Sequence, residues 1–159
     1  MELAEIRYDD PVVQELVHEV QAEYGRRYGG DGDTSPMDAE RFVAPHGRFF
    51  LARVAGEPVG MGGWRWGGPV NGDAEIKRMY VREGHRRTGV ARTILAELER
   101  TAEAAGVHRL VLETGSAQPE AIAMYRASGF VDIPAFGHYA CAPEAVHLGK
   151  DLTGTARGV

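Results

Sequence analysis

The chain of 159 residues has little of what would mark it as secreted, membrane-bound or metal-binding. Its single cysteine, Cys141, has no internal partner for a disulfide. One thiol is also too few to build a cysteine zinc site. No apolar run approaches the roughly 20 residues that span a bilayer. Acidic side chains outnumber basic ones among the first ten residues, whereas a signal peptide begins with basic residues. We therefore expect a cytoplasmic protein that contacts no membrane and needs no metal.

Basic charge is also in deficit. There are 18 Lys and Arg against 23 Asp and Glu, which gives a formal net charge of −5 at pH 7. This balance argues against nucleic acid as the main partner. Two phosphate-binding patterns are missing as well. The chain contains neither the G-x-x-x-x-G-K-[ST] loop of nucleotide hydrolases nor the G-x-G-x-x-G fingerprint of dinucleotide-binding domains.

Length and periodicity predict one globular α/β domain over residues 1–152, followed by a disordered tail at 153–159. The expected helices cover residues 11–28, 35–43, 88–105 and 119–128. The expected strands cover residues 2–8, 48–54, 59–66, 73–82, 109–114, 130–133 and 145–152. Glycines inside the strand at 59–66 indicate a bulge or a close backbone contact. Imperfect alternation in the strand at 73–82 indicates a second bulge.

The stretch from Glu75 to Ala91 carries the clearest functional signal. It runs from a strand into a cationic turn and then into an amphipathic helix. The start of a helix attracts anions, because its first N–H groups lack partners and the helix dipole is positive there. Gly89 and Ala91 let a ligand approach the backbone. Six cations crowd residues 77–92 and support an anion site: Lys77, Arg78, Arg82, Arg86, Arg87 and Arg92.

Two motifs in this order resemble those of the GCN5-related N-acetyltransferase (GNAT) family. Arg86-x-x-Gly89-x-Ala91 resembles the family's pyrophosphate loop, Gln/Arg-x-x-Gly-x-Gly/Ala. The stretch from Gln118 to Phe130 is similar to the second signature, Asn-x-x-Ala-x-x-Leu/Phe-Tyr-x-x-x-Gly-Phe/Tyr. Gln118 and Met124 depart from that signature, but each keeps the chemistry or size of the usual residue.

The resemblance implies a fold and an activity. The fold is a mixed, mostly antiparallel sheet of six to seven strands, with a V-shaped splay between strands four and five and about four flanking helices. The strands at 73–82 and 109–114 would form the splay. The activity is direct transfer of an acetyl group from acetyl-CoA, the co-substrate, to a primary amine. No metal takes part.

The resemblance also implies roles for particular residues. Residues Met79, Tyr80 and Val81 would bind the acetyl and pantetheine groups through the main chain. The pyrophosphate would lie on Arg86, Arg87, Thr88, Gly89, Val90, Ala91 and Arg92, and Gln118 would add a contact. Tyr125 would protonate the departing thiolate or hydrogen-bond the sulfur. Glu75 would be the general base, with Asp73 and Glu113 as alternatives.

The acceptor is less well defined. The family usually lines its acceptor site with the first helix, which here carries Tyr24, Arg26, Arg27 and Tyr28. We expect a small amine that bears a carboxylate or phosphate, read by Arg26 or Arg27, with the loop 136–139 covering the acceptor side. Two alternatives stay open: a non-catalytic acyl-CoA sensor, and an acetyltransferase for protein lysines or N-termini. The sequence also leaves homodimerisation open.

Overall fold

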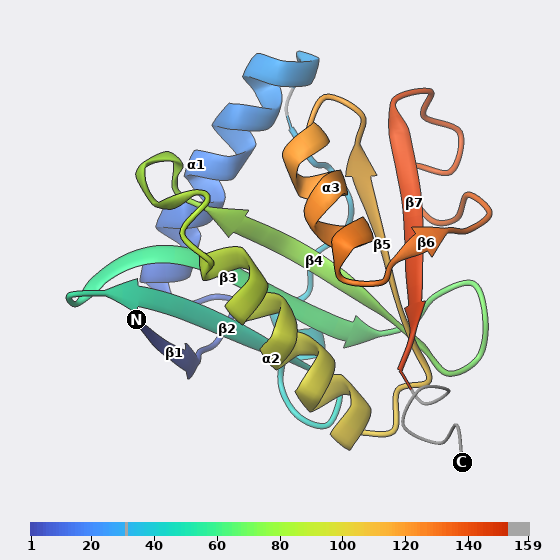
Figure 1. The fold of residues 1–159 in the computed structure, drawn as a ribbon, viewed down its shortest axis with the longest axis horizontal. Helices are drawn as coiled ribbons and strands as arrows, with labels where there is room; N and C mark the ends of the chain where they lie inside the picture. The colour runs from blue at the N-terminus through green and yellow to red at the C-terminus, as the bar shows by residue number, and fades with distance from the viewer. Residues whose placement is uncertain (31, 153–159) are drawn as a thin grey trace.

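A seven-stranded mixed sheet crosses the molecule in a computed structural model that describes residues 1–30 and 32–152 (Figure 1). The order of strands in the sheet is β1-β2-β3-β4-β5-β7-β6. Strands β4 and β5 are parallel, and the other neighbouring pairs are antiparallel. The strands are β1 (Glu2–Glu5), β2 (Gly47–Val54), β3 (Glu57–Trp66), β4 (Asp73–Val81), β5 (Arg109–Gly115), β6 (Val131–Asp132) and β7 (Ala145–Asp151). The tail predicted at 153–159 lies outside the described residues.

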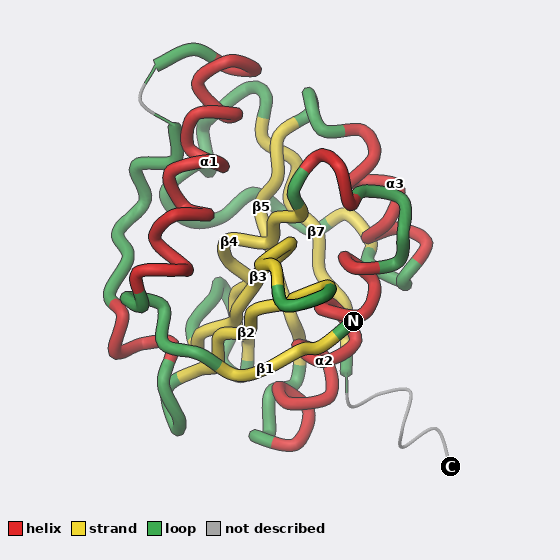
Figure 2. The backbone as a smooth tube through the Cα atoms, turned by 90° about the vertical axis from the view of Figure 1, so that its left-hand side faces the viewer, coloured by secondary structure: helices red, strands yellow, loops and turns green. Residues whose placement is uncertain are grey.

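Three α-helices cover the two faces of the sheet. They are α1 (Pro11–Tyr28), α2 (Val90–Ala104) and α3 (Pro119–Ala127). Helix α1 lies on one face, and α2 and α3 lie on the other, so Figure 2 shows the strands between two helical layers. Helix α1 begins as the sequence predicts, with Pro11 in the first turn and the Asp10 carboxylate accepting from Val12 N at 2.9 Å. Among these described helices, none is both long and apolar enough to cross a membrane.

The prediction of a helix at residues 35–43 is wrong. A short 3₁₀ turn, η1 (Ala39–Phe42), stands there instead. Ser35, at the start of the predicted helix, donates its hydroxyl to Asp33 Oδ1 at 2.6 Å. The cap moves to Asp38, whose carboxylate accepts from Glu40 N at 3.0 Å. The described part of the chain therefore has three α-helices instead of about four.

The glycines of β3 mark a close approach of α2, as the sequence predicts. A Cβ atom on Gly60 or Gly62 would lie 3.1 Å from the Ile94 side chain. The larger of the two cores fills this face, with Ile94, Leu95 and Leu98 of α2 packed against Trp64 and their other neighbours. Glycine lowers the strand propensity of this segment, but it allows the helix to pack closely against the sheet.

The bulge predicted in β4 is present. Met61 pairs with Tyr80 but Gly63 pairs with Lys77, so two β4 residues, Arg78 and Met79, face one residue of β3. Arg78 adopts φ 58°, a left-handed conformation that is uncommon for a residue other than glycine. Regular alternation would place Lys77 and Arg78 on opposite faces of the sheet. The bulge instead lets both side chains reach the same carboxylate, that of Asp33.

The β2–β3 hairpin offers a test of the local backbone. Val54 pairs with Glu57, so the loop is only Ala55-Gly56, with φ of 51° and 83°. Two positive φ values indicate a type I′ turn, in which Asn-Gly is preferred. We expect Ala55→Asn to raise the free energy of unfolding by about 0.5–1 kcal/mol. Urea unfolding measures this. The control Ala55→Val, β-branched at the same φ, should lower it, and equal stability of the two variants would contradict the assignment.

Candidate active site

A cavity of about 1070 Å³ opens where β4 and β5 separate. The two strands pair only at Asp73–Arg109, Ala74–Leu110 and Glu75–Val111. Beyond that point β4 continues along β3 and β5 continues along β7. The cavity is lined by parts of α1, β4, the loop before α2, β5, α3 and the loop before β7. The splay expected between the fourth and fifth strands is therefore confirmed.

One end of the cavity is the start of α2. Its N-cap residue, Gly89, has φ 90° and makes no side-chain capping bond. A Cβ on Gly89 would meet nothing within 4 Å, so the space beside the backbone is open. Arg87, Gly89, Ala91 and Arg92 line the cavity here. Uncapped N–H groups, the helix dipole and nearby guanidinium groups fit a pyrophosphate.

The six cations of this stretch do not form a single anion site, contrary to the sequence-based expectation. Arg82 binds Glu19 of α1, with one contact of 3.0 Å from Nε to Oε1. Arg86 binds Glu23 of α1 at 2.7 Å and also donates to Val81 O at 2.8 Å. These two arginines fasten α1 to the end of β4 and the loop after it. Sequence spacing places charges along the chain but does not reveal carboxylates on another element.

The remaining loop residues differ in what they present to the cavity. Arg87 and Glu120 of α3 form an exposed ion pair of 3.0 Å, and both line the cavity. Thr88 and Val90 are absent from the lining. The Thr88 hydroxyl donates to His85 O, and the Val90 side chain packs into the core. Only the main-chain N–H groups of these two residues remain suited to an anion.

The free edge of β4 forms the middle of the cavity. Met79, Tyr80 and Val81, the residues predicted to bind the acetyl and pantetheine groups, all line it. Because β5 pairs no further than Glu75, the main chain of these residues on that side is not engaged by β5. An extended ligand can therefore add to this edge as a strand would. The Tyr80 ring also carries the Arg86 guanidinium, 5.7 Å from its centroid.

Helix α3 and the residue before it supply the two predicted site residues of the second motif. Gln118 and Tyr125 both line the cavity. The Gln118 amide donates to the Tyr28 hydroxyl at 3.4 Å. Tyr125 is 4% exposed and packs edge-to-face on Phe130 at 5.5 Å. Burial raises the pKa of the Tyr125 hydroxyl, so it stays protonated at neutral pH and can donate a proton.

The three candidate bases occupy different environments. Asp73 accepts two hydrogen bonds from Arg109, at 2.9 and 2.7 Å, and does not line the cavity. Glu75 lies 3.4 Å from Arg65 on β3, and it too is absent from the lining. Glu113 does line the cavity, and burial raises its pKa to about 7 despite the opposing charge of Lys77. The geometry therefore favours Glu113, the sequence-based alternative, over Glu75.

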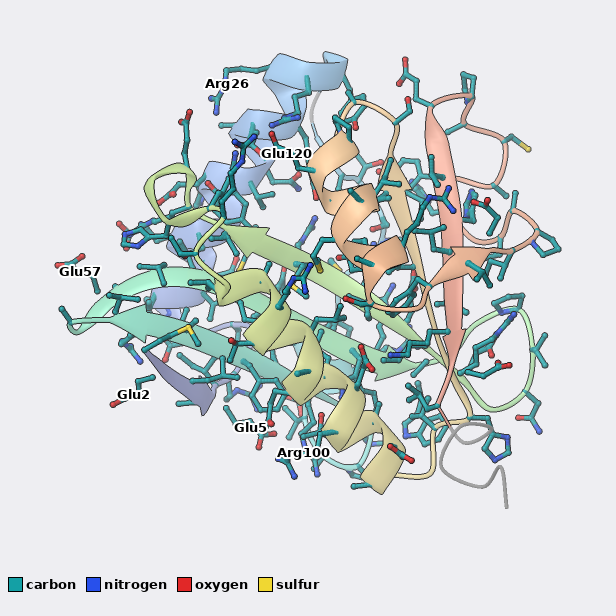
Figure 3. All side chains as sticks on the ribbon, in the orientation of Figure 1. Glu2, Glu5, Arg26, Glu57, Arg100 and Glu120 are labelled. Atoms are coloured by element: carbon teal, nitrogen blue, oxygen red, sulfur yellow. The ribbon has the colours of Figure 1, made fainter. Side chains whose placement is uncertain are left out.

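The residues expected on the acceptor side are only partly brought together. Tyr24, Arg27 and Tyr28 line the cavity, whereas Arg26 does not. Arg26 is exposed at the outer end of α1 and is directed away from the sheet (Figure 3). Arg27 lies on the cavity wall, where its Nη1 donates to Ala117 O at 2.6 Å. This contact ties Arg27 to the loop before α3.

Asp33 is the site residue that sequence reasoning missed. It follows α1 and lines the cavity, where Lys77, Arg78 and Tyr139 converge on it. The sequence around it is a polar turn, a composition that predicts a solvated loop. The missing signal is tertiary, because Lys77, Arg78 and Tyr139 lie 44 residues or more away along the chain.

The family model described as "Acetyltransferase (GNAT) family" matches residues 13–130. The chain belongs to the GNAT acetyltransferase family. An "IAA acetyltransferase" of Azospirillum brasilense is 36% identical to this GNAT enzyme over 143 residues, which are 90% of this chain and 92% of the relative. The predicted fold class and enzyme class are thus confirmed.

Solved structures agree with the family assignment. A Klebsiella pneumoniae protein that carries the name acyl-CoA N-acyltransferase has a TM-score of 0.79 and 28% identity, covering 95% of this chain and 97% of its own. An aminoglycoside 6′-N-acetyltransferase in complex with coenzyme A has a TM-score of 0.71 and 13% identity, covering 96% and 97%. The second likeness shows a shared fold. The GNAT chain thus adopts an architecture found in a protein with coenzyme A bound.

The raised pKa of Glu113 predicts a pH-dependent stability. The folded state holds the Glu113 proton more tightly than the unfolded chain does, so the stability that this carboxyl contributes below pH 4.5 is lost as the pH rises through about 7. Glu113→Gln keeps the side chain uncharged. We expect this variant to gain more stability over the wild type at pH 8 than at pH 5. Urea unfolding at both pH values measures the difference.

Glu120→Gln is the control for this experiment, because Glu120 is exposed at the start of α3 (Figure 3). Its effect should be small at both pH values. A Glu113→Gln effect that is the same at pH 5 and pH 8 would show that the Glu113 carboxyl is not held protonated by burial.

Proposed function

We propose that this GNAT enzyme, acting as a single domain over residues 1–152, transfers the acetyl group of acetyl-CoA to the primary amine of a small molecule. The observation that carries the proposal is one continuous cavity. It is lined by the start of α2, the free edge of β4, a buried tyrosine and a carboxyl with a pKa of about 7. These are the groups that thioester binding, amine deprotonation and thiolate protonation require.

Acetyl-CoA would lie along the cavity in an extended form. Its pyrophosphate would rest on the main-chain N–H groups from Thr88 to Arg92, with Arg87 and Arg92 adding charge. Arg86 would support this loop from behind through Glu23. The pantetheine would add to the free edge of Met79, Tyr80 and Val81, which carries the thioester toward Tyr125.

The reaction needs one base and one acid. An amine acceptor arrives as an ammonium ion, and Glu113, directly or through water, takes one proton. The free amine attacks the thioester carbonyl, and a main-chain N–H of the Met79–Val81 segment stabilises the oxyanion. The C–S bond then breaks. The thiolate takes a proton from Tyr125, which recovers one from the new amide nitrogen, so the products are the amide, CoA thiol and the proton held by Glu113.

The acceptor end favours a small molecule over a protein segment. The Tyr139 hydroxyl donates to Asp33 Oδ1 and accepts from Thr34 N, both at 2.8 Å. These bonds join the loop before β7 to the segment after α1, so Asp33 and Tyr139 form a connected wall of the cavity. The name of the Azospirillum relative, IAA acetyltransferase, refers to a compound and agrees with this choice. A sensor needs neither Glu113 nor Tyr125, so their placement favours an enzyme.

Thiol release from acetyl-CoA against a panel of amines, amino acids and peptides tests the proposal. Glu113→Gln should lower kcat by about 10²–10⁴-fold, the usual contribution of a general base. It should also abolish the rise of kcat/KM with pH through about 7 that the wild type shows as Glu113 ionises. Tyr125→Phe should lower kcat with little effect on acetyl-CoA affinity.

Glu75→Gln is the matched control, because Glu75 is an acidic residue of β4 that does not line the cavity. It should keep the pH profile. Loss of the profile in Glu75→Gln together with its retention in Glu113→Gln would contradict the assignment of the base. Acetyl-CoA binding without turnover on any acceptor would favour the sensor.

A further inference from the structure

An ionic cluster of Asp33, Lys77 and Arg78 lies at the acceptor end of the cavity, and the mechanism above leaves it without a role. The side chains of Lys77 and Arg78 are only 8% and 4% exposed, yet both residues line the cavity. Both bind one oxygen, Asp33 Oδ2, at 3.3 and 2.9 Å. The other Asp33 oxygen accepts from Ser35 and Tyr139. Asp33 therefore has no free oxygen lone pairs directed at a ligand.

The cluster is unbalanced in charge. Burial alone would raise the pKa of Asp33, but Lys77, the bonds from Ser35 and Arg78 together lower it well below its usual range. Asp33 is therefore ionised at neutral pH, and two cations face one anion. Burying net charge is costly unless a counter-charge is supplied. A cluster that served only to hold the fold together would be expected to carry equal charges.

The backbone places the second cation here at a cost. Arg78 occupies the bulge of β4 with φ 58°, a conformation that costs about 1 kcal/mol or more in a residue with a Cβ. The bulge brings its guanidinium to the same carboxylate as Lys77. Its Nε donates to the Tyr8 hydroxyl at 3.3 Å and its Nη1 to Asp33, while Nη2 has no hydrogen-bond partner within residues 1–30 and 32–152.

The site stays unbalanced in charge when a simple amine binds. Ionised Glu113 offsets the excess cation of the cluster, but the ammonium group of the acceptor adds another positive charge. Moving its proton to Glu113 leaves that net charge of the site unchanged. An acceptor that carries its own carboxylate removes this imbalance. A single negative charge is enough to balance the excess positive charge of the cluster. This favours a carboxylate over a phosphate dianion as the anionic group of the acceptor.

We propose that the acceptor is an amino acid or a close analogue, whose carboxylate binds Lys77 and Arg78 while its amine faces Glu113. This inference rests on the proposed function and names its substrate class. It replaces Arg26 and Arg27 as the residues that read the acceptor's anionic group. Tyr139 is expected to hold Asp33 in place, so that Asp33 positions both cations without contacting the acceptor.

Binding to the CoA-loaded protein tests the subsite without requiring turnover. Calorimetry would compare a panel of L-amino acids with their carboxamides and with the amines that lack the carboxylate. We expect each bound amino acid to bind at least about 10-fold more tightly than its two partners, a ratio within reach of one charge-assisted hydrogen bond. Equal affinity across the matched sets, or no binding of any amino acid, would overturn the proposal.

Two variants assign the preference to the cluster. Arg78→Gly removes the guanidinium and suits the positive φ, and Lys77→Gln removes the ammonium but keeps a donor. Either should reduce the preference for the acid over the amide to near unity and leave CoA affinity unchanged. Arg26→Gln, on the exposed end of α1, is the control and should keep the preference. A preference that survives in both cluster variants would overturn the assignment.

Failure of the inference differs from failure of the proposed function. Amino acids that bind with this preference, yet are never acetylated, would contradict the transferase and uphold the subsite. Acetylation of amides and simple amines as efficiently as of amino acids would uphold the transferase and overturn the subsite. If a cluster variant does not fold, the wild-type comparison of acid, amide and amine still decides.

Discussion

The parting of β4 and β5 is the constraint on which the site depends. The strands hold together over three residue pairs, and Arg109 locks the first pair through two hydrogen bonds to Asp73. After Glu75 the two strands take separate neighbours. This separation leaves one edge of β4 free for an extended ligand, and Glu113 of β5 lines the cavity that opens there. A carboxyl so placed loses much of its hydration, which is why its pKa is raised.

Charge in this enzyme has two separate uses. Arg82 and Arg86 pair with carboxylates of α1 and attach that helix to the end of β4 and to the loop after it. These ion pairs fix the position of α1 relative to the loop before α2. Lys77 and Arg78, on the bulge a few residues earlier, are buried against Asp33 and leave one positive charge in excess. In the proposed complex, the helix N-terminus at Gly89 would bind the pyrophosphate mainly through its main-chain N–H groups.

Much of this could be predicted from the sequence, because local rules govern it. Periodicity located α1 and α2, the glycines of β3 foretold the close packing of Ile94, and broken alternation indicated the bulge at Arg78 and Met79. The rest depends on contacts between distant segments. The Ser35 hydroxyl, at the start of the predicted helix, donates to Asp33, which in turn binds Lys77 and Arg78 of β4. Glu75 and Glu113 look equivalent in a strand pattern, and only the splay decides which of them reaches the cavity.

A crystal structure of the complex with coenzyme A and an amino acid would show directly whether the gap between β4 and β5 is the active site. We expect the pyrophosphate at residues 88–92, the pantetheine along the free edge of β4, the sulfur beside the Tyr125 hydroxyl and the amino acid's amine facing Glu113. A cofactor bound outside the gap between β4 and β5, or a sulfur remote from both Tyr125 and Glu113, would contradict it.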